Sequence, residues 1–259
     1  MALISDLVSA IAEVEGIPEA TAQLIARYTR EAGHLSQGAR GRNAPRATVT
    51  DAANLLIALN AGGCIAREAA DAVEPFRALI AHAPHHRREP VPGVGIEIIG
   101  IEDPSLKFLD RHGATFGEIL ESVIERAIGG ELEHLMMSHA LAQVHPQIIE
   151  EARAKYGEDD KRNIALAIRK ACRGLLSVGV ASFSIEFHRP RPFAQIVIDR
   201  IAGSGPHRDL IARVPFILTA EEIMKPKQRT FGGSDGDRSE RTVVGYRTLM
   251  KIGEVLMPA

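Results

Sequence analysis

The first chemically distinctive stretch of the chain is EAGHLSQGARGRNAPR, which runs from Glu31 to Arg46. Between Arg27 and Arg46 the sequence holds five arginines and one glutamate, whereas the charged side chains of the first 26 residues are all acidic. Guanidinium groups bind phosphate through charge and paired hydrogen bonds. Because the formal net charge of the whole chain is only -2, this local excess of positive charge favours a confined site for a polyanion.

Two helices are predicted directly before this stretch. The segment 5–15 has apolar residues at helical spacing and is followed by Gly16, a typical helix stop. The segment 18–32 begins with a proline, which suits the first turn of a helix, and a glycine follows it. The residues that we expect on the inner face of this second helix are Ala20, Leu24, Ile25 and Tyr28.

The order of these elements carries a resemblance. A supporting helix, a turn at Gly16-Ile17 and a second helix are followed by the exit AGHLS and a loop rich in glycine and arginine. This layout resembles the winged helix-turn-helix DNA-binding proteins, many of which leave the second helix through an AGLIS-type sequence. The resemblance covers about residues 3–60. It implies that helix 18–32 enters the major groove and that residues 37–47 form a basic wing on the flanking backbone or minor groove.

The resemblance also implies roles for single residues. Gln23 could pair with adenine and Thr21 with phosphate or a thymine methyl group, because both lie near the N-terminal end of the second helix. Arg27 and Arg30 are better placed for backbone phosphates. The full set of expected DNA-binding residues is Glu19, Thr21, Gln23, Arg27, Arg30, Gln37, Arg40, Arg42, Asn43 and Arg46.

The rest of the chain predicts further helices and antiparallel strands. Residues 65–83 predict a helix interrupted near Pro75. Phe183, Ile185 and Phe187 alternate with polar residues before the turn HRPRP, a pattern typical of a β-hairpin with one buried face. The other predicted helices cover residues 115–129, 147–157 and 160–176, and a last helix ends the chain.

At 259 residues the chain is long enough for two modest domains, and we expect an α+β fold. A winged helix-turn-helix domain is expected at residues 1–83, and the proline-rich stretch 84–93 is the expected linker. Residues 94–259 are expected to form a mixed domain of helices and antiparallel sheet. That second domain would serve dimerisation, partner contact or ligand sensing.

Catalytic and metal-binding patterns are absent from the sequence. The chain has no phosphate-binding loop, dinucleotide glycine fingerprint, GxSxG elbow or HExxH motif, so we expect no enzyme and no cofactor. His134 and His139 are five residues apart, whereas a helical metal pair needs four, so no metal is expected there. The sequence also lacks an apolar run long enough to span a membrane and a signal-peptide pattern at its start, which favours a cytoplasmic protein.

These features together predict a sequence-specific protein for double-stranded DNA, acting as a bacterial or phage transcriptional regulator. A homodimer is expected, since single winged domains bind weakly, and contact with the transcription machinery is a further expectation. The excess of arginine over lysine, 24 to 7, fits a GC-rich bacterial or prophage origin. Two alternatives stay open: a phage DNA-packaging or replication protein with the same head, and a protein-interaction adaptor without DNA affinity.

Overall fold

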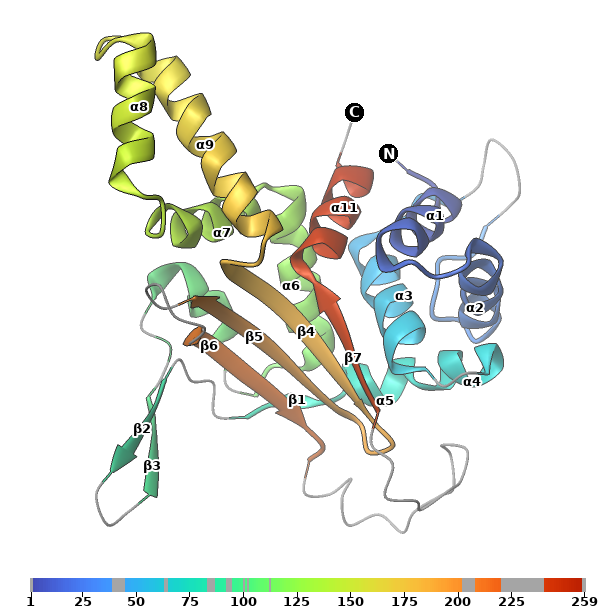
Figure 1. The fold of residues 1–259 in the computed structure, drawn as a ribbon. Coiled ribbons are helices and arrows are strands. Elements are labelled where there is room, and N and C mark those ends of the chain that lie inside the picture. The colour runs from blue at the N-terminus through green and yellow to red at the C-terminus, as the bar shows by residue number, and fades with distance from the viewer. Residues whose placement is uncertain are drawn as a thin grey trace.

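The computed structural model describes residues 2–38, 45–62, 65–82, 101, 103–111, 113–201, 208–219 and 240–257, and the backbone of 87–91 and 95–99. It is a mixed structure of helices and antiparallel strands, as expected (Figure 1). The helices are α1 Ile4–Glu15, α2 Glu19–Glu31, α3 Val49–Ala61, α4 Ala66–Asp71, α5 Val73–Arg77, η2 Pro104–Leu109, α6 Phe116–Ile128, α7 Glu131–Leu141, α8 Pro146–Tyr156, α9 Lys161–Ser177 and α11 Tyr246–Leu256. The strands are β1 Ile80–Ala81, β2 Arg87–Val91, β3 Gly95–Ile99, β4 Ala181–Arg189, β5 Phe193–Ile201, β6 Arg208–Ile217 and β7 Glu240–Gly245.

The centre of the molecule is a sheet built around the expected hairpin. Within the described residues, five strands form one antiparallel sheet in the order β1-β6-β5-β4-β7. In the hairpin of β4 and β5, Phe183 pairs with Ile198 and Phe187 with Ala194, which confirms the prediction. Strands β2 and β3 pair with each other as a separate antiparallel ribbon. The central sheet therefore has β7 at one edge and the short β1 at the other.

One face of the central sheet carries the hydrophobic core. Phe183, Ile185 and Phe187 point to this face and are buried, as the alternation predicts. The ring centroid of Phe187 lies 5.9 Å from that of Phe76 in α5 and 5.7 Å from that of Phe116 in α6. These tilted and edge-on contacts, together with burial of the rings, hold α5 and α6 against the sheet. The opposite face of the sheet carries the polar side chains of Ser182, Ser184 and Glu186.

The N-terminal helices share this core with the sheet. A single cluster of buried apolar residues extends from Ile4 in α1 to Ile252 in α11 and includes residues of β4, β5 and β6. Strand β1 pairs with β6, so residues before the expected linker belong to the same sheet as residues after it. Strand β2 lies within that linker. Residues on both sides of the boundary expected at 84–93 therefore contribute to one core.

The segment 65–83 is an interrupted helix, as we expected, but it ends in a strand. It forms α4 and α5, which meet at Ala72, and then enters β1. Pro75 is the third residue of α5, within the first turn, where its missing N–H is not needed by the helix. It cannot, however, donate the N–H that would continue α4 to the carbonyl of Asp71, four residues earlier, so the interruption expected near Pro75 is confirmed.

Helices α8 and α9 form an arm that projects from the body, at the top left of Figure 1. Its base holds a small cluster of buried residues, Ala140, Val144 and Cys172, separate from the main core. Further out the arm leaves apolar side chains in solvent, including Leu166, which is 54% exposed.

Close packing of α11 on α6 predicts opposite effects for two glycine substitutions. A Cβ on Gly253 would lie 2.7 Å from the backbone carbonyl carbon and oxygen of Ala127, whereas a Cβ on Gly174 in the exposed α9 would meet nothing within 4 Å. Gly253→Ala is therefore expected to lower the free energy of unfolding by about 1–3 kcal/mol. Gly174→Ala is expected to raise it by roughly 0.5–1 kcal/mol. Urea unfolding of both variants checks this, and equal effects would contradict the packing of α11 on α6.

Candidate functional site

The outward surface of α2 is the first candidate site. The inner face of the helix packs against α1, α3 and α4, and Ala22, Ile25 and Thr29 are buried there. Helix α2 lies at the periphery of the molecule, on the right of Figure 1. The expected DNA-binding side chains of α2 are all exposed: Glu19, Thr21, Gln23, Arg27 and Arg30. In the described part of the chain, the surface that the resemblance assigns to DNA is therefore accessible.

The inner face of α2 is rotated relative to our expectation. Leu24 is 44% exposed and Ala20 is also exposed, although we expected both inside, while Ala22 is fully buried. Small residues, Ala22, Ala26 and Thr29, form the contact surface together with Ile25, and their size lets the neighbouring helices approach closely. The hydroxyl of Thr29 is satisfied within the helix by donating to the carbonyl of Ile25 at 2.8 Å. The prediction that the large side chain of Leu24 lies in the core is therefore wrong.

Several polar side chains on α2 already have partners within the protein. The carboxylate of Glu19 accepts hydrogen bonds from the hydroxyl of Ser9 at 2.7 Å and from the amide of Gln23 at 3.1 Å. Arg27 Nε donates to Glu31 Oε1 at 2.7 Å, one turn further on. Exposed pairs of this kind contribute little to stability, so a phosphate can replace Glu31 as the partner of Arg27.

A buried aspartate fixes both ends of the arginine-rich segment. Asp51 is 2% exposed and accepts the backbone N–H of Ser36 at 2.6 Å and its hydroxyl at 2.9 Å. The same carboxylate accepts the N–H of Thr48 at 2.9 Å and its hydroxyl at 2.7 Å. Residues 37–47 therefore begin and end at one point, next to the first turn of α3.

The remaining expected DNA contacts lie on this segment. The amide of Gln37 donates to the carbonyl of Arg30 at 3.3 Å, at the end of α2. Arg46 forms an antiparallel bridge with Leu3, directly before α1. Arg40, Arg42 and Asn43 lie outside the described residues. The structure thus brings Gln37 and Arg30 together and places Arg46 at the start of the neighbouring helix.

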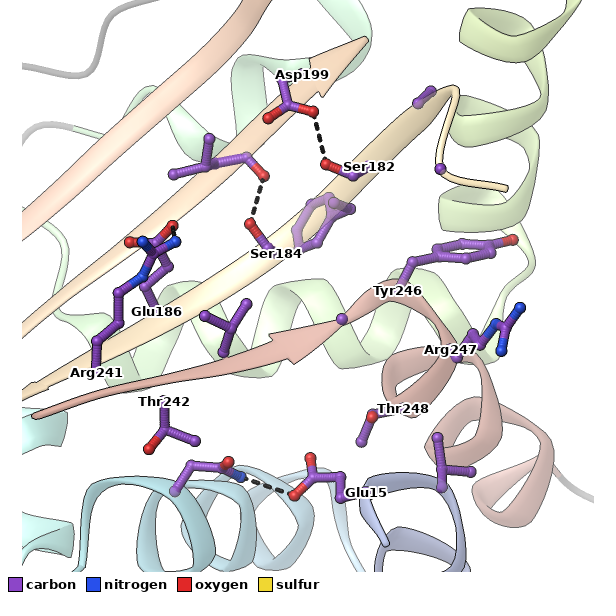
Figure 2. Close-up of a pocket in the computed structure, with 18 of the residues that line it drawn as sticks. Glu15, Ser182, Ser184, Glu186, Asp199, Arg241, Thr242, Tyr246, Arg247 and Thr248 are labelled. Atoms are coloured by element: carbon purple, nitrogen blue, oxygen red, sulfur yellow. Dashed lines mark hydrogen bonds and ion pairs between the residues drawn. The ribbon is translucent and has the colours of Figure 1, made fainter. Parts of the chain in front are cut away.

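A second candidate site, which the sequence did not reveal, is a groove beside β7. It has a volume of about 900 Å³ and extends from the C-terminal ends of α1 and α3 to the outer face of the sheet. Figure 2 shows Glu15, Thr242 and Thr248 along one side of β7 and Ser182 and Ser184 along the other. Ligand pockets in proteins are typically of this size.

Glu15, the last residue of α1, is the most perturbed acid in this groove. Burial raises the pKa of its carboxyl to about 7, and the neighbouring polar side chains of Asn60 and Thr248 oppose this shift in part. The amide of Asn60 donates to Oε2 at 3.1 Å, whereas Oε1 is buried and has no hydrogen-bond partner within the described residues. An unpartnered buried carboxylate oxygen is costly for stability, because its lost hydration is not replaced.

On the side of the groove that the sheet forms, the carboxylates have hydrogen-bond partners within the protein. Glu186, whose side chain is 7% exposed, accepts from Arg241 Nη2 at 2.5 Å and also from Gln195, and His188 Nε2 lies 3.3 Å away. Asp199 accepts hydrogen bonds from the hydroxyl of Ser182 and from Arg208. Figure 2 shows the bond from Ser182. These carboxylates are neutralised locally, so Glu15 differs from them in having an open acceptor.

One signal for Glu15 was present in the sequence. A carboxylate in the last turn of a helix faces the negative end of the helix dipole, which is an unfavourable position. An acid directly before the stop Gly16 could therefore have been singled out. Nothing in the local sequence, however, places Asn60 and Thr248 beside it, since they come from α3 and α11.

Among the described side chains, no three of the types His, Cys, Asp and Glu come together in a way that could hold a metal ion. No helix in the described parts of the chain has the length and apolar character needed to cross a membrane.

Comparison with known proteins adds no relative. No protein-family model, curated protein or solved structure matches the chain. The chemistry of the two candidate sites is therefore the basis for inferring a function.

Proposed function

We propose that this protein binds double-stranded DNA in a sequence-specific manner and acts as a bacterial or phage transcriptional regulator, without a catalytic step. The observation that carries the proposal is the exposed outward surface of α2 beside a basic segment, 37–47, whose two ends are fixed at Asp51. An exposed helix next to an anchored basic loop is the arrangement with which winged helix-turn-helix proteins contact a duplex.

In this proposal α2 lies in the major groove, which is wide enough for a helix. Thr21 and Gln23 face the base edges near its N-terminal end. Glu19 was expected to contact DNA, but it does not do so in this proposal. Ser9 of α1 and Gln23 hold its carboxylate, and a carboxylate repels phosphate. For Gln23 to contact a base, its 3.1 Å hydrogen bond to Glu19 has to open.

The helix α2 and the segment 37–47 differ in net charge. On α2 the two arginines, Arg27 and Arg30, are balanced by Glu19 and Glu31, so the helix itself adds little net attraction for a polyanion. The arginines of the segment 37–47 have no acid between them in sequence. Affinity is therefore assigned to the loop and base selection to α2.

A homodimer fits this function, because two heads on two half-sites compensate for the weak binding of one. We place the contact between copies on the arm of α8 and α9. Its exposed apolar residues need a cover, and its acidic tip, residues 158–160, can meet Arg169 and Lys170 of an antiparallel second arm. Light scattering separates this dimer from the ring expected of the packaging or replication alternative.

The experiment that tests DNA binding is a fluorescence-anisotropy titration with a labelled random-sequence 30-base-pair duplex and with sites enriched from a random library. The variant Arg40→Ala/Arg42→Ala/Arg46→Ala is expected to bind both kinds of duplex about 10- to 100-fold more weakly, because it loses phosphate contacts. The matched control Lys107→Ala/Arg111→Ala/Arg191→Ala removes the same charge from exposed positions that lie outside α2, the segment 37–47 and the arm.

The control is expected to keep wild-type affinity. Equal weakening by both triple variants would show that only overall charge matters. No salt-dependent binding by the wild-type protein to any duplex would favour the adaptor alternative instead.

A further inference from the structure

We infer that the groove beside β7 binds a small organic amine, whose ammonium group sits on Glu15 and whose aliphatic body lies against the neighbouring apolar side chains. This inference is independent of DNA binding, because the groove and α2 use different residues. It rests on the geometry of the carboxyl group, the nature of the groove wall beside it and the balance of charge along the rest of the groove.

The carboxyl group of Glu15 offers one open acceptor. Its Oε2 is held by Asn60, which is itself fixed because its amide also donates to the carbonyl of Leu56 at 3.1 Å. Its Oε1 is buried without a partner among the described residues. An ammonium group supplies both the missing donor and the positive charge that a buried carboxylate lacks.

The groove wall next to Glu15 is apolar and hydroxylated and carries no base. Val14, Ile17 and Leu59 line it together with Thr242 and Thr248. A short aliphatic chain can bury its surface against these residues, at about 25 cal/mol per Å². No Lys, Arg or His of the described residues pairs with Glu15, so a cationic ligand meets no resident competitor there.

The distant part of the groove limits the ligand to a single positive charge. Its charged or titratable groups, apart from Glu15, are Glu186, Asp199, Arg208, Arg241, Tyr246 and Arg247. The two carboxylates are already bound by arginine, and Tyr246 is neutral because burial and the nearby Glu133 carboxylate raise its pKa to about 12. A polyamine would find no second anionic partner, whereas a monoamine or an amino acid with its carboxylate toward the arginines fits.

Isothermal titration calorimetry with two probes tests the inference and distinguishes a plain amine from an amino acid as the ligand. The probes are n-butylamine, a plain amine, and L-norvaline, an amino acid of similar chain length. At least one is expected to bind at pH 8 with a dissociation constant of about 0.1–10 mM, the range of fragment-sized ligands. Binding of n-butylamine alone assigns a plain amine, whereas a preference for L-norvaline assigns an amino acid, and either result supports the inference.

Three further measurements tie binding to Glu15. Glu15→Gln is expected to weaken binding about 10- to 100-fold, and Glu13→Gln, at an exposed position of the same helix, to leave it unchanged. With the wild-type protein, affinity is expected to fall roughly 30-fold from pH 8 to pH 5.5, because the carboxyl with its pKa of about 7 takes up a proton. Titrations at pH 7 in phosphate and in Tris are expected to report release of about half a proton per ligand bound.

Absence of binding by both probes, or equal binding by wild type and Glu15→Gln, would overturn the inference. Loss of DNA binding in the arginine triple variant does not affect these titrations, so the two proposals fail or succeed separately.

Discussion

Raising the salt concentration from 50 to 200 mM is expected to weaken duplex binding by about 100-fold if the anchored basic loop contacts phosphates. The segment from Arg27 to Arg46 has five arginines and one glutamate, a net local charge of +4. Neutralising about four phosphates releases the counterions condensed on them, and the logarithm of the affinity then falls with a slope of about -0.9 per phosphate. Anisotropy titrations at four or more salt concentrations give this slope directly.

The arginine triple variant is expected to lower the slope by about three, in proportion to the phosphates that it no longer contacts. The control triple Lys107→Ala/Arg111→Ala/Arg191→Ala is expected to keep the wild-type slope. A slope near zero for the wild-type protein would mean that no phosphate contact exists, whatever the affinity at low salt.

The Glu15→Gln variant is expected to be more stable than the wild type at pH 8, by about 3 kcal/mol in the free energy of unfolding. The folded protein holds the pKa of Glu15 at about 7, above its usual 4.5. A group whose pKa is raised by folding stabilises the native state fully below the unfolded pKa. That contribution is lost as the pH rises from about 4.5 through 7, because the buried carboxylate must then carry its charge. Glutamine keeps the shape and removes the charge.

Urea unfolding of both proteins between pH 5 and pH 8 measures this difference. The two are expected to have similar stability at pH 5 and to separate as the pH rises. Glu13→Gln controls for the loss of one acid from α1, because Glu13 is exposed. A constant difference between wild type and Glu15→Gln at all pH values would mean that Glu15 is not buried as described.

Local sequence patterns predicted the elements with strong periodicity or clear caps. Thr115 caps α6 and exchanges hydrogen bonds with Glu118, and the left-handed Gly16 ends α1, as expected from residue type. The alternation of Phe183, Ile185 and Phe187 likewise predicted the buried face of β4. In each case the physical cause lies within a few residues of chain.

Features that depend on distant neighbours were not predictable in this way. The buried face of α2 is chosen by the close approach of α1 and α4, so Ala22 is inside and Leu24 outside. The groove arises where the ends of α1 and α3 meet β7 and α11, from segments far apart in sequence. Its unusual carboxyl group has a perturbed pKa only because the fold brings Asn60 and Thr248 to it.

Because Ser36 and Thr48 both bind Asp51, the sequence of the basic loop can change in evolution without a change in the helices that support it. Since the closure is made by four hydrogen bonds outside the loop, insertions or exchanges between these two residues leave the helices in place. Doubling the length of a flexible loop costs only about 0.6 kcal/mol in closure entropy. Descendants of this chain could thus acquire a higher or lower affinity for DNA through changes within residues 37–47, with the supporting helices inherited intact.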